Sequence, residues 1–450
     1  MNQNFSRRHF IRNASIGISG AIVVPTILSS CAKGANDRIL IGHIGVGSRG
    51  TTELLNYFLP LREANNIAVC DVFRDKREKA AEYINNFYKE NKVKSDPCLV
   101  YSDYEELLQN KEIDAVHITT PDHWHIQMAI KAARAGKHIM LAKPLGLSYP
   151  EYKILIKELN KNDVRFHYGP QQRTYDHLKL GYDIIRDGKI GEIERVDVWA
   201  PEGQSVSPPC NEASVPDDLD YERWIGPAPM RPYCPERTKN LGSWFINDYS
   251  IGWLAGWGAH PLDIMVWIVK EKVKGGYTVT GTGKIPPSGS LFDTVYSWDV
   301  AFAYRNGFDL HFSSFEVARQ NGMIGNRKVE ESNGTTFYGS KGWISLSRRS
   351  AESNISEIHD KLNNFPKTKD GYISSENNTM GRRFISVVRE KEKELCPLDE
   401  AIISDTISHM GNIAIRTGRK ITWDPKQGQV VDDSEANNLY SREMRSPYLI

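Results

Sequence analysis

Positions 45–50 read Gly-Val-Gly-Ser-Arg-Gly, a G-x-G-x-x-G spacing that lets a backbone turn tightly and approach a pyrophosphate closely. An apolar run at 38–44 precedes the glycines, and apolar residues at helical spacing follow at 49–58. The loop therefore joins a strand to a helix, where backbone N–H groups favour an anionic phosphate. We expect Gly45, Gly47 and Gly50 to hold a dinucleotide.

An acid at the end of the following strand is expected to select the cofactor. Asp71 ends the apolar stretch 66–71 and lies about 20 residues beyond Gly50, where an acid meets the adenosine ribose. A carboxylate accepts hydrogen bonds from a 2′-hydroxyl and repels a 2′-phosphate. NAD is therefore the expected cofactor, and Arg74 nearby leaves NADP as the weaker alternative.

The pattern around these residues predicts an α/β fold with two domains. Strand candidates at 38–44, 66–71, 114–120, 138–144 and 164–169 alternate with helix candidates at 49–58, 75–91, 123–136 and 149–161. Such alternation is typical of a doubly wound parallel sheet with right-handed crossovers. We place this Rossmann domain at 38–165.

Residues 166–450 should form a second α/β domain, because most of its strand candidates alternate polar and apolar residues with no helix between them. That pattern predicts a large, open, mainly antiparallel sheet. Arg-Asn-Gly at 305–307 is expected to be a hairpin turn, and the Pro-rich stretch 202–238 an irregular excursion that walls a site.

The first 31 residues resemble an export signal. Ser6–Asn13 contains paired arginines before an apolar stretch, as in the twin-arginine signal, and Leu28–Cys31 resembles a lipobox whose cysteine is lipidated. We expect an exported, periplasmic protein that meets the membrane only through a lipid on Cys31. An uncleaved anchor helix is the alternative.

Composition limits the classes of partner that the protein is expected to bind. The 450 residues carry a formal net charge of +1 with no clustered basic run, which argues against nucleic acid. The six cysteines include no C-x-x-C pair. The His-Trp-His fragment at 123–125 has no Cys or acid pattern that would complete a metal site, so no metal is expected.

Thr-Thr-Pro-Asp-His-Trp-His (119–125), Leu-Ala-Lys-Pro-Leu-Gly-Leu-Ser (141–148) and Gly-Trp-Gly-Ala-His-Pro-Leu-Asp-Ile (256–264) carry a resemblance. Together with the glycine loop, they resemble the glucose–fructose oxidoreductase / inositol dehydrogenase / rhizopine catabolism (Gfo/Idh/MocA) family. The resemblance spans 38–450. It implies a Rossmann domain, a substrate domain with an open sheet, hydride transfer between NAD(P) and a sugar hydroxyl, and association into homo-oligomers.

The resemblance also assigns residues. Lys143 and His260 would be catalytic, and Pro144 would follow a cis bond. The cofactor's phosphates and nicotinamide side would be lined by Ser48, Arg49, Thr120, His123, Trp124, His125, Lys143 and either Gln171 or Gln172. The substrate would contact Arg173 and His260. Two departures stand out: Ala142 replaces the acid before the lysine, and Gly256 replaces the usual aspartate before the histidine.

Elementary chemistry gives these groups roles. Lys143 can polarise the hydroxyl oxygen, and a histidine that titrates near neutrality can move its proton. Asp263 lies three residues after His260, on the same helix face, and could orient the imidazole. Trp253 and Trp257 offer aromatic faces to a sugar ring.

Three functions remain open. The first is an NAD-dependent oxidoreductase of sugars or glycosides that retains and recycles its cofactor, because free NAD has no evident supply outside the cytoplasm. The second is a redox-neutral, NAD-dependent glycosidase or epimerase, although the altered lysine motif of such relatives differs from Lys143-Pro144. The third is an inactive sugar-binding homologue, which Ala142 and Gly256 would suit.

Overall fold

The computed structural model describes residues 38–450, apart from position 240 and the segments 324–331, 369–370 and 373–378. The predicted export signal at 1–31 lies outside the described residues. In the part that is described, none of the helices has the length and apolar character needed to span a bilayer.

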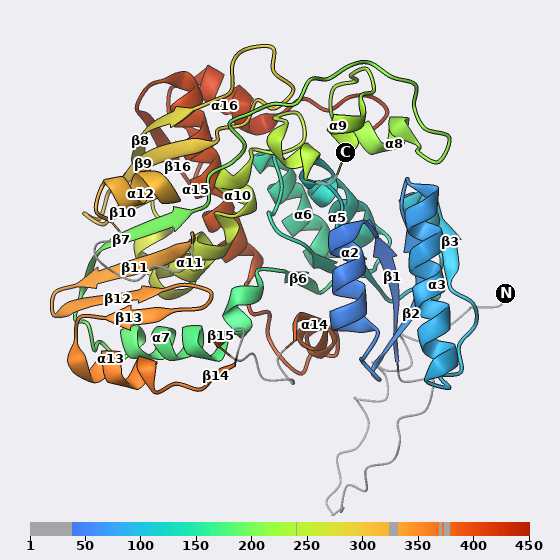
Figure 1. Cartoon of the computed structure of the whole chain (residues 1–450), viewed down its shortest axis with the longest axis horizontal. Coiled ribbons are helices and arrows are strands. Elements are labelled where there is room, and N and C mark those ends of the chain that lie inside the picture. The colour runs from blue at the N-terminus through green and yellow to red at the C-terminus, as the bar shows by residue number, and fades with distance from the viewer. Residues whose placement is uncertain (1–37, 240, 324–331, 369–370, 373–378) are drawn as a thin grey trace, which may run out of the picture. The chain divides into compact units, whose positions relative to one another are not determined.

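The N-terminal domain is built on a six-stranded parallel sheet in the order β3-β2-β1-β4-β5-β6. Figure 1 labels β1, β2, β3 and β6 of this sheet. Its strands are β1 (Ile39–Ile44), β2 (Ala64–Cys70), β3 (Leu99–Tyr101), β4 (Ala115–Ile118), β5 (His138–Leu141) and β6 (Phe166–Tyr168). The order reverses between β1 and β4, which opens a crevice at the carboxyl ends of these two strands. The predicted doubly wound sheet is confirmed.

Helices cover both faces of the sheet because consecutive residues of its buried strands, such as Ile139, Met140 and Leu141, are apolar and point to opposite faces. Ile139 and Leu141 of β5 belong to the core beneath α5 and α6, whereas Met140 belongs to the core beneath α3. The helical segments here are α2 (Ser48–Glu53), the π-helix η2 (Leu54–Phe58), α3 (Arg74–Glu90), α4 (Tyr104–Gln109), the 3-10 turn η3 (Asp122–Trp124), α5 (His125–Arg134) and α6 (Tyr149–Lys161).

Three features of this domain differ from the prediction. Strand β3 and helix α4 were not expected, since Leu99 and Val100 form an exposed edge and lack a buried apolar pattern. Strand β6 completes the sheet just past residue 165, so the domain extends beyond its predicted limit. Helix α14 (Met380–Val388) comes from far along the chain and packs against the π-helix η2, and its Phe384 joins the core on that face of the sheet.

The C-terminal domain contains a nine-stranded sheet in the order β13-β12-β11-β7-β10-β9-β8-β16-β17. Its neighbours pair antiparallel except β7 and β10, which are parallel, so the mainly antiparallel prediction is confirmed. Gly307, with φ +81°, turns the predicted β9–β10 hairpin. The strands are β7 (Ile193–Ala200), β8 (Tyr277–Lys284), β9 (Ser297–Tyr304), β10 (Asp309–Ser314), β11 (Gly334–Gly339), β12 (Gly342–Leu346), β13 (Ala351–Ser353), β16 (Ile421–Asp424) and β17 (Gln429–Val430); β14 (Lys367–Thr368) and β15 (Gly371–Tyr372) pair separately.

Contrary to the expectation of strands without intervening helices, several helices separate β7 from β8. They include α11, which packs with α15 over one part of the sheet and carries the His260 segment. The helical segments of this domain are η4 (Gln171–Thr174), α7 (Asp176–Arg186), α8 (Tyr221–Ile225), α9 (Pro235–Thr238), η5 (Gly242–Phe245), α10 (Trp253–Gly256), α11 (Ala259–Val273), α12 (Phe315–Gln320), α13 (Ser356–Asn363), α15 (Leu398–Thr417) and α16 (Ser434–Ser441).

A disulfide closes the predicted irregular excursion. Cys210 and Cys234 are bonded across 24 residues of the Pro-rich segment. The other cysteines in the described part, Cys70, Cys98 and Cys396, are free and buried. The disulfide fastens a segment that otherwise has little secondary structure of its own.

Candidate active site

The glycine loop follows β1, and the surroundings explain each of its glycines. An added Cβ at Gly45, where φ is +83°, would lie 2.8 Å from the Thr119 carbonyl carbon. At Gly50 it would lie 2.0 Å from the Gly45 carbonyl oxygen. An added Cβ at Gly47 would have no atom within 4 Å. The first and third glycines thus allow tight packing, and the middle one leaves the backbone open to a ligand.

A cleft of about 1030 Å³ opens beside this loop. Asp71 lines it at the end of β2, and its carboxylate accepts the N–H groups of Val46 at 2.9 Å and Phe73 at 3.0 Å. Burial raises the pKa of Asp71, and the two backbone N–H groups oppose that rise. With two N–H groups bound, the carboxylate still has acceptor capacity for ribose hydroxyls.

These observations fit a dinucleotide. The open backbone at Gly47 suits the pyrophosphate, and Asp71 suits the ribose, as the sequence predicts. Arg74, which left NADP open, donates to the Asp217 carbonyl at 2.6 Å instead of lining the cleft. The predicted cofactor residues that line the cleft are Gly45, Gly47, Ser48, Arg49, Asp71, Thr120 and Trp124.

Two predicted cofactor residues have structural contacts instead. His123 lies close to the Trp224 carbonyl, at 3.2 Å, and packs on Tyr249. Both ring nitrogens of His125 face backbone carbonyls, those of Pro144 and Thr120. Neither histidine lines the cleft, which corrects the expectation that they border the nicotinamide. Trp124 of the same turn does line the cleft, and its indole N–H donates to the Trp224 carbonyl at 3.2 Å.

Gln171 is also placed differently from the prediction. Its amide donates to Glu53 at 3.3 Å, and it does not line the cleft. Glu53 in turn pairs with Arg49 at 2.6 Å and with His117 at 2.8 Å. Burial, the largest single influence, raises the pKa of Glu53, but the hydrogen bonds and charges of His117 and Arg49 together outweigh it, so the pKa of Glu53 is lowered. Sequence reasoning missed Glu53, although the i,i+4 spacing from Arg49 was a usable signal.

Lys143 follows β5 and reaches across to the C-terminal domain. Its Nζ donates to the Gly256 carbonyl at 2.6 Å and lies 4.7 Å from the centre of the Trp244 ring. Burial lowers the pKa of Lys143 to about 8, against the attraction of Asp122. Asp122, another residue that sequence reasoning missed, is held by Ser250 and Trp244. The predicted Lys143–Pro144 cis bond is confirmed.

His260 begins the helix that follows the Gly256 segment. Its ring is buried, its Nδ1 has no hydrogen-bond partner among the described residues, and it lies 5.7 Å from the Trp257 ring. Burial, then the charges of Arg348, Lys143 and Arg49, lower the pKa of His260 well below 6.5. The histidine is therefore neutral around pH 7, which corrects the expectation that it titrates there.

The tryptophans proposed for the substrate lie beside this histidine. Trp253 and Trp257 are half-buried and pack edge to face, with ring centres 6.1 Å apart. The guanidinium of Arg348 lies over the Trp257 ring, 5.2 Å from its centre. The short segment Gly256–His260 therefore carries the histidine and is contacted by two cations, Lys143 at Gly256 and Arg348 at Trp257. No pattern in the sequence pointed to Arg348.

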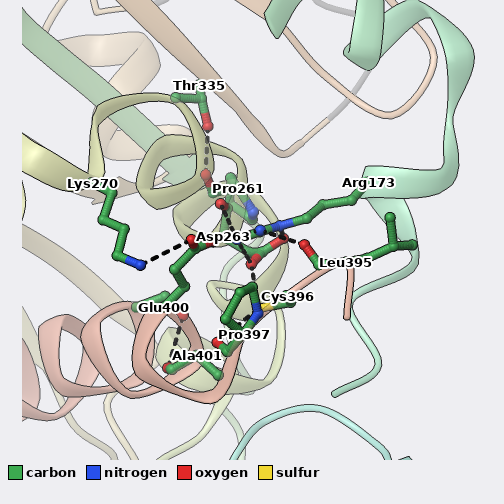
Figure 2. Close-up of polar contacts among 11 residues, drawn as sticks. Arg173, Pro261, Asp263, Lys270, Thr335, Leu395, Cys396, Pro397, Glu400 and Ala401 are labelled. Atoms are coloured by element: carbon green, nitrogen blue, oxygen red, sulfur yellow. Dashed lines mark hydrogen bonds and ion pairs between the residues drawn. The ribbon is translucent and has the colours of Figure 1, made fainter. Parts of the chain in front are cut away.

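Arg173 and Asp263 have a different role from the predicted one. Figure 2 shows the Arg173 guanidinium holding both carboxylate oxygens of Asp263, at 2.6 and 2.8 Å. Arg173 also donates to the Leu395 carbonyl and to Glu400, and the Cys396 thiol faces Asp263 at 3.2 Å (Figure 2). Asp263 therefore does not orient His260, and Arg173 is committed within the protein. The shared helix face was predicted correctly, but the buried arginine is the stronger partner.

Curated relatives match only part of the chain. An uncharacterized oxidoreductase, ORF334, of Rhizobium meliloti is 32% identical over 128 residues, which are 28% of this chain and 38% of the relative. An alpha-N-acetylgalactosaminidase of Shewanella oneidensis is 30% identical over 217 residues, which are 42% and 44% of the two chains. The chain thus spans less than half the length of these relatives.

Solved structures share the fold over most of the chain. Scyllo-inositol dehydrogenase from Lactobacillus casei, with bound NAD(H) and scyllo-inositol, is 17% identical with a TM-score of 0.57, covering 86% of this chain and 99% of that one. Aldose-aldose oxidoreductase from Caulobacter crescentus, complexed with glycerol, is 14% identical with a TM-score of 0.61, covering 86% and 100%.

Family models complete the comparison. The NAD-binding Rossmann fold of the oxidoreductase family matches residues 39–170, and the family's C-terminal alpha/beta domain matches 205–450. These ranges correspond to the parallel sheet and to most of the mixed sheet. The chain belongs to the Gfo/Idh/MocA family of oxidoreductases.

Proposed function

We propose that this protein is an NAD-dependent oxidoreductase that acts on a secondary hydroxyl of a sugar or glycoside and keeps its cofactor bound. The observation that carries the proposal is the meeting of Lys143 and the His260 segment. A strand-end lysine with a pKa of about 8 reaches the segment that carries a buried, neutral histidine. NAD, held by the glycine loop and Asp71, would supply the hydride acceptor.

Each side chain around the substrate hydroxyl has its own role in the proposed reaction. The neutral amine of Lys143 accepts the proton of the substrate hydroxyl, and a neighbouring nicotinamide cation would lower its pKa further. The unpartnered Nδ1 of His260 is available to the same hydroxyl. Trp253 and Trp257 offer aromatic surface to the sugar ring. Gly256, which stands where the family usually has an aspartate, contributes its backbone carbonyl to hold the lysine.

Export is part of the proposal. The paired Arg7 and Arg8 and the lipobox at Cys31 are the primary support, and the Cys210–Cys234 disulfide suits an oxidising compartment. The twin-arginine route exports folded proteins, so NAD can be captured before export. We propose a periplasmic protein, anchored through lipid, that recycles its NAD by reducing a second substrate.

The test begins with the purified protein. Mass spectrometry after denaturation identifies the dinucleotide that it carries. Sugars and glycosides are then added to the NAD-loaded protein, and the reduced-nicotinamide absorbance is followed. A Lys143-dependent rise supports the oxidoreductase. A protein that carries NAD but shows no absorbance change and no product with any sugar would instead favour the inactive binding homologue.

A redox-neutral glycosidase is the second candidate, favoured by the similarity to the alpha-N-acetylgalactosaminidase over 217 residues. In that case an aryl glycoside would release its aglycone with no net change in nicotinamide absorbance. The intact Lys143-Pro144 pair ranks this candidate second.

A further inference from the structure

Arg348 is a cation that the protein leaves uncompensated. It follows β12 and stacks over Trp257, and its Nε is buried without a hydrogen-bond partner. Among the described residues, its guanidinium also forms no ion pair with an acid. A partly buried arginine with unfilled donors is costly unless a ligand fills them.

The neighbouring cations are balanced differently. Arg49 is paired with the Glu53 carboxylate at 2.6 Å, and Lys143 has Asp122 as its opposing charge. Within the part of the chain that the structure describes, Arg348 has no such ion pair with an acid. Its charge also acts on His260 and on Tyr57 of the Rossmann domain, so the guanidinium over Trp257 lies near side chains of both domains. An anion that bound there would restore neutrality beside the reacting hydroxyl.

We propose that Arg348 binds a carboxylate of the substrate, so that the sugar is a uronic acid or another carboxylated sugar. The inference rests on the proposed function, whose substrate class it narrows. A guanidinium presents coplanar N–H donors that match the two oxygens of a carboxylate, and stacking on Trp257 would hold that plane in place. A neutral sugar would leave the charge unmatched.

The test uses the NAD-loaded protein and matched pairs of methyl glycosides and methyl uronides, of gluco, galacto and manno configuration. Each pair differs only in a hydroxymethyl group or a carboxylate. Tryptophan fluorescence measures binding, which does not require turnover. We expect at least one uronide to bind about 10-fold more tightly than its neutral partner.

The variants assign that preference to one residue. Arg348→Gln should bring the ratio of the two dissociation constants to about 1, and Arg348→Lys should retain part of it. Arg349→Gln, which removes the same charge at the exposed neighbouring position, should keep the ratio. NAD content of each variant is measured in parallel.

The inference is overturned if no pair shows a preference for the uronide, or if the preference survives Arg348→Gln. It is also overturned if Arg348→Gln loses its NAD, because the guanidinium would then bind the cofactor and not the substrate. The proposed function fails separately. If uronides bind through Arg348 but nicotinamide absorbance never changes and no product forms, the carboxylate site stands and the oxidoreductase proposal falls.

Discussion

The Nζ of Lys143 donates a hydrogen bond to the Gly256 carbonyl at 2.6 Å, which ties the end of β5 to the segment that carries His260. A lysine of the parallel sheet thereby enters the C-terminal domain. Because this placement buries the amine, its pKa falls to about 8. The consequence for activity can be measured.

Oxidation should accelerate as the pH rises, with a midpoint at or below about 8, because only the neutral amine accepts the hydroxyl proton and the nicotinamide cation lowers the pKa of Lys143 further. Because folding lowers the pKa of Lys143 from 10.5 to about 8, burying the charged amine costs free energy of folding. That cost is complete below pH 8 and fades as the pH rises above 8. Lys143→Ala should lose on the order of 10²–10⁴ in turnover and flatten the profile.

Lys153→Ala, at an exposed position, is the control for Lys143→Ala and should leave the profile intact. A pH profile of Lys143→Ala that keeps the midpoint of the unmodified protein would assign that titration to another group.

His260 should add no limb near pH 6.5, because burial and three neighbouring cations keep the ring neutral there. His260→Ala should reduce turnover by on the order of 10²–10⁴ while NAD stays bound. Steady-state rates between about pH 5.5 and 7.5, bracketing the ordinary histidine range, check this. An acid limb in that range that vanishes in His260→Ala would contradict the neutral assignment.

Asp263→Asn should destabilise the fold instead of acting first on catalysis. The substitution removes one of the two carboxylates that pair with the buried Arg173 and leaves only Glu400, which should cost about 1.5–3 kcal/mol in the free energy of unfolding. Denaturant titration measures the loss. Glu271→Gln breaks an exposed pair with Lys274 and should cost less than about 0.5 kcal/mol. Equal stability of Asp263→Asn and the unmodified protein would restore the orienting role that the sequence suggested.

Asp71→Ala should weaken NAD binding by at least about 10-fold, because it removes a ribose acceptor and frees the Val46 and Phe73 N–H groups of the loop. NADP binding should weaken less, since the repulsive carboxylate is also removed. Calorimetric titration of both cofactors is the measurement, and Asp75→Ala, at an exposed site nearby, is the control. Similar affinities of the unmodified protein for NAD and NADP would count against the assignment.

Replacing Arg7 and Arg8 by Lys should retain the protein in the cytoplasm, and Cys31→Ser should prevent lipidation. Fractionation detects both effects. Thiol labelling after denaturation adds a second readout: in the retained variant Cys210 and Cys234 should label as free thiols, because the cytoplasm keeps cysteines reduced. Membrane attachment of both variants at normal levels would refute the lipoprotein signal.

Local sequence patterns were enough to predict the Rossmann sheet and the cofactor cleft. The glycine loop, Asp71 and the alternation of short apolar strands with amphipathic helices act locally, so spacing alone places them. Strand β3 was not predicted, because its residues Leu99 and Val100 are exposed and give no pattern of buried apolar positions.

Which charged side chains meet depends on how distant segments pack in the folded chain. Asp263 shares a helix face with His260, as spacing predicted, yet Arg173, some 90 positions away, takes the carboxylate. Lys143 meets Gly256, and Arg348 meets Trp257, across similar gaps in the chain. Local periodicity sets the direction of a side chain, but the partner of a buried charge is set by which elements pack against it. That packing depends on many apolar contacts across both domains, which no single segment encodes.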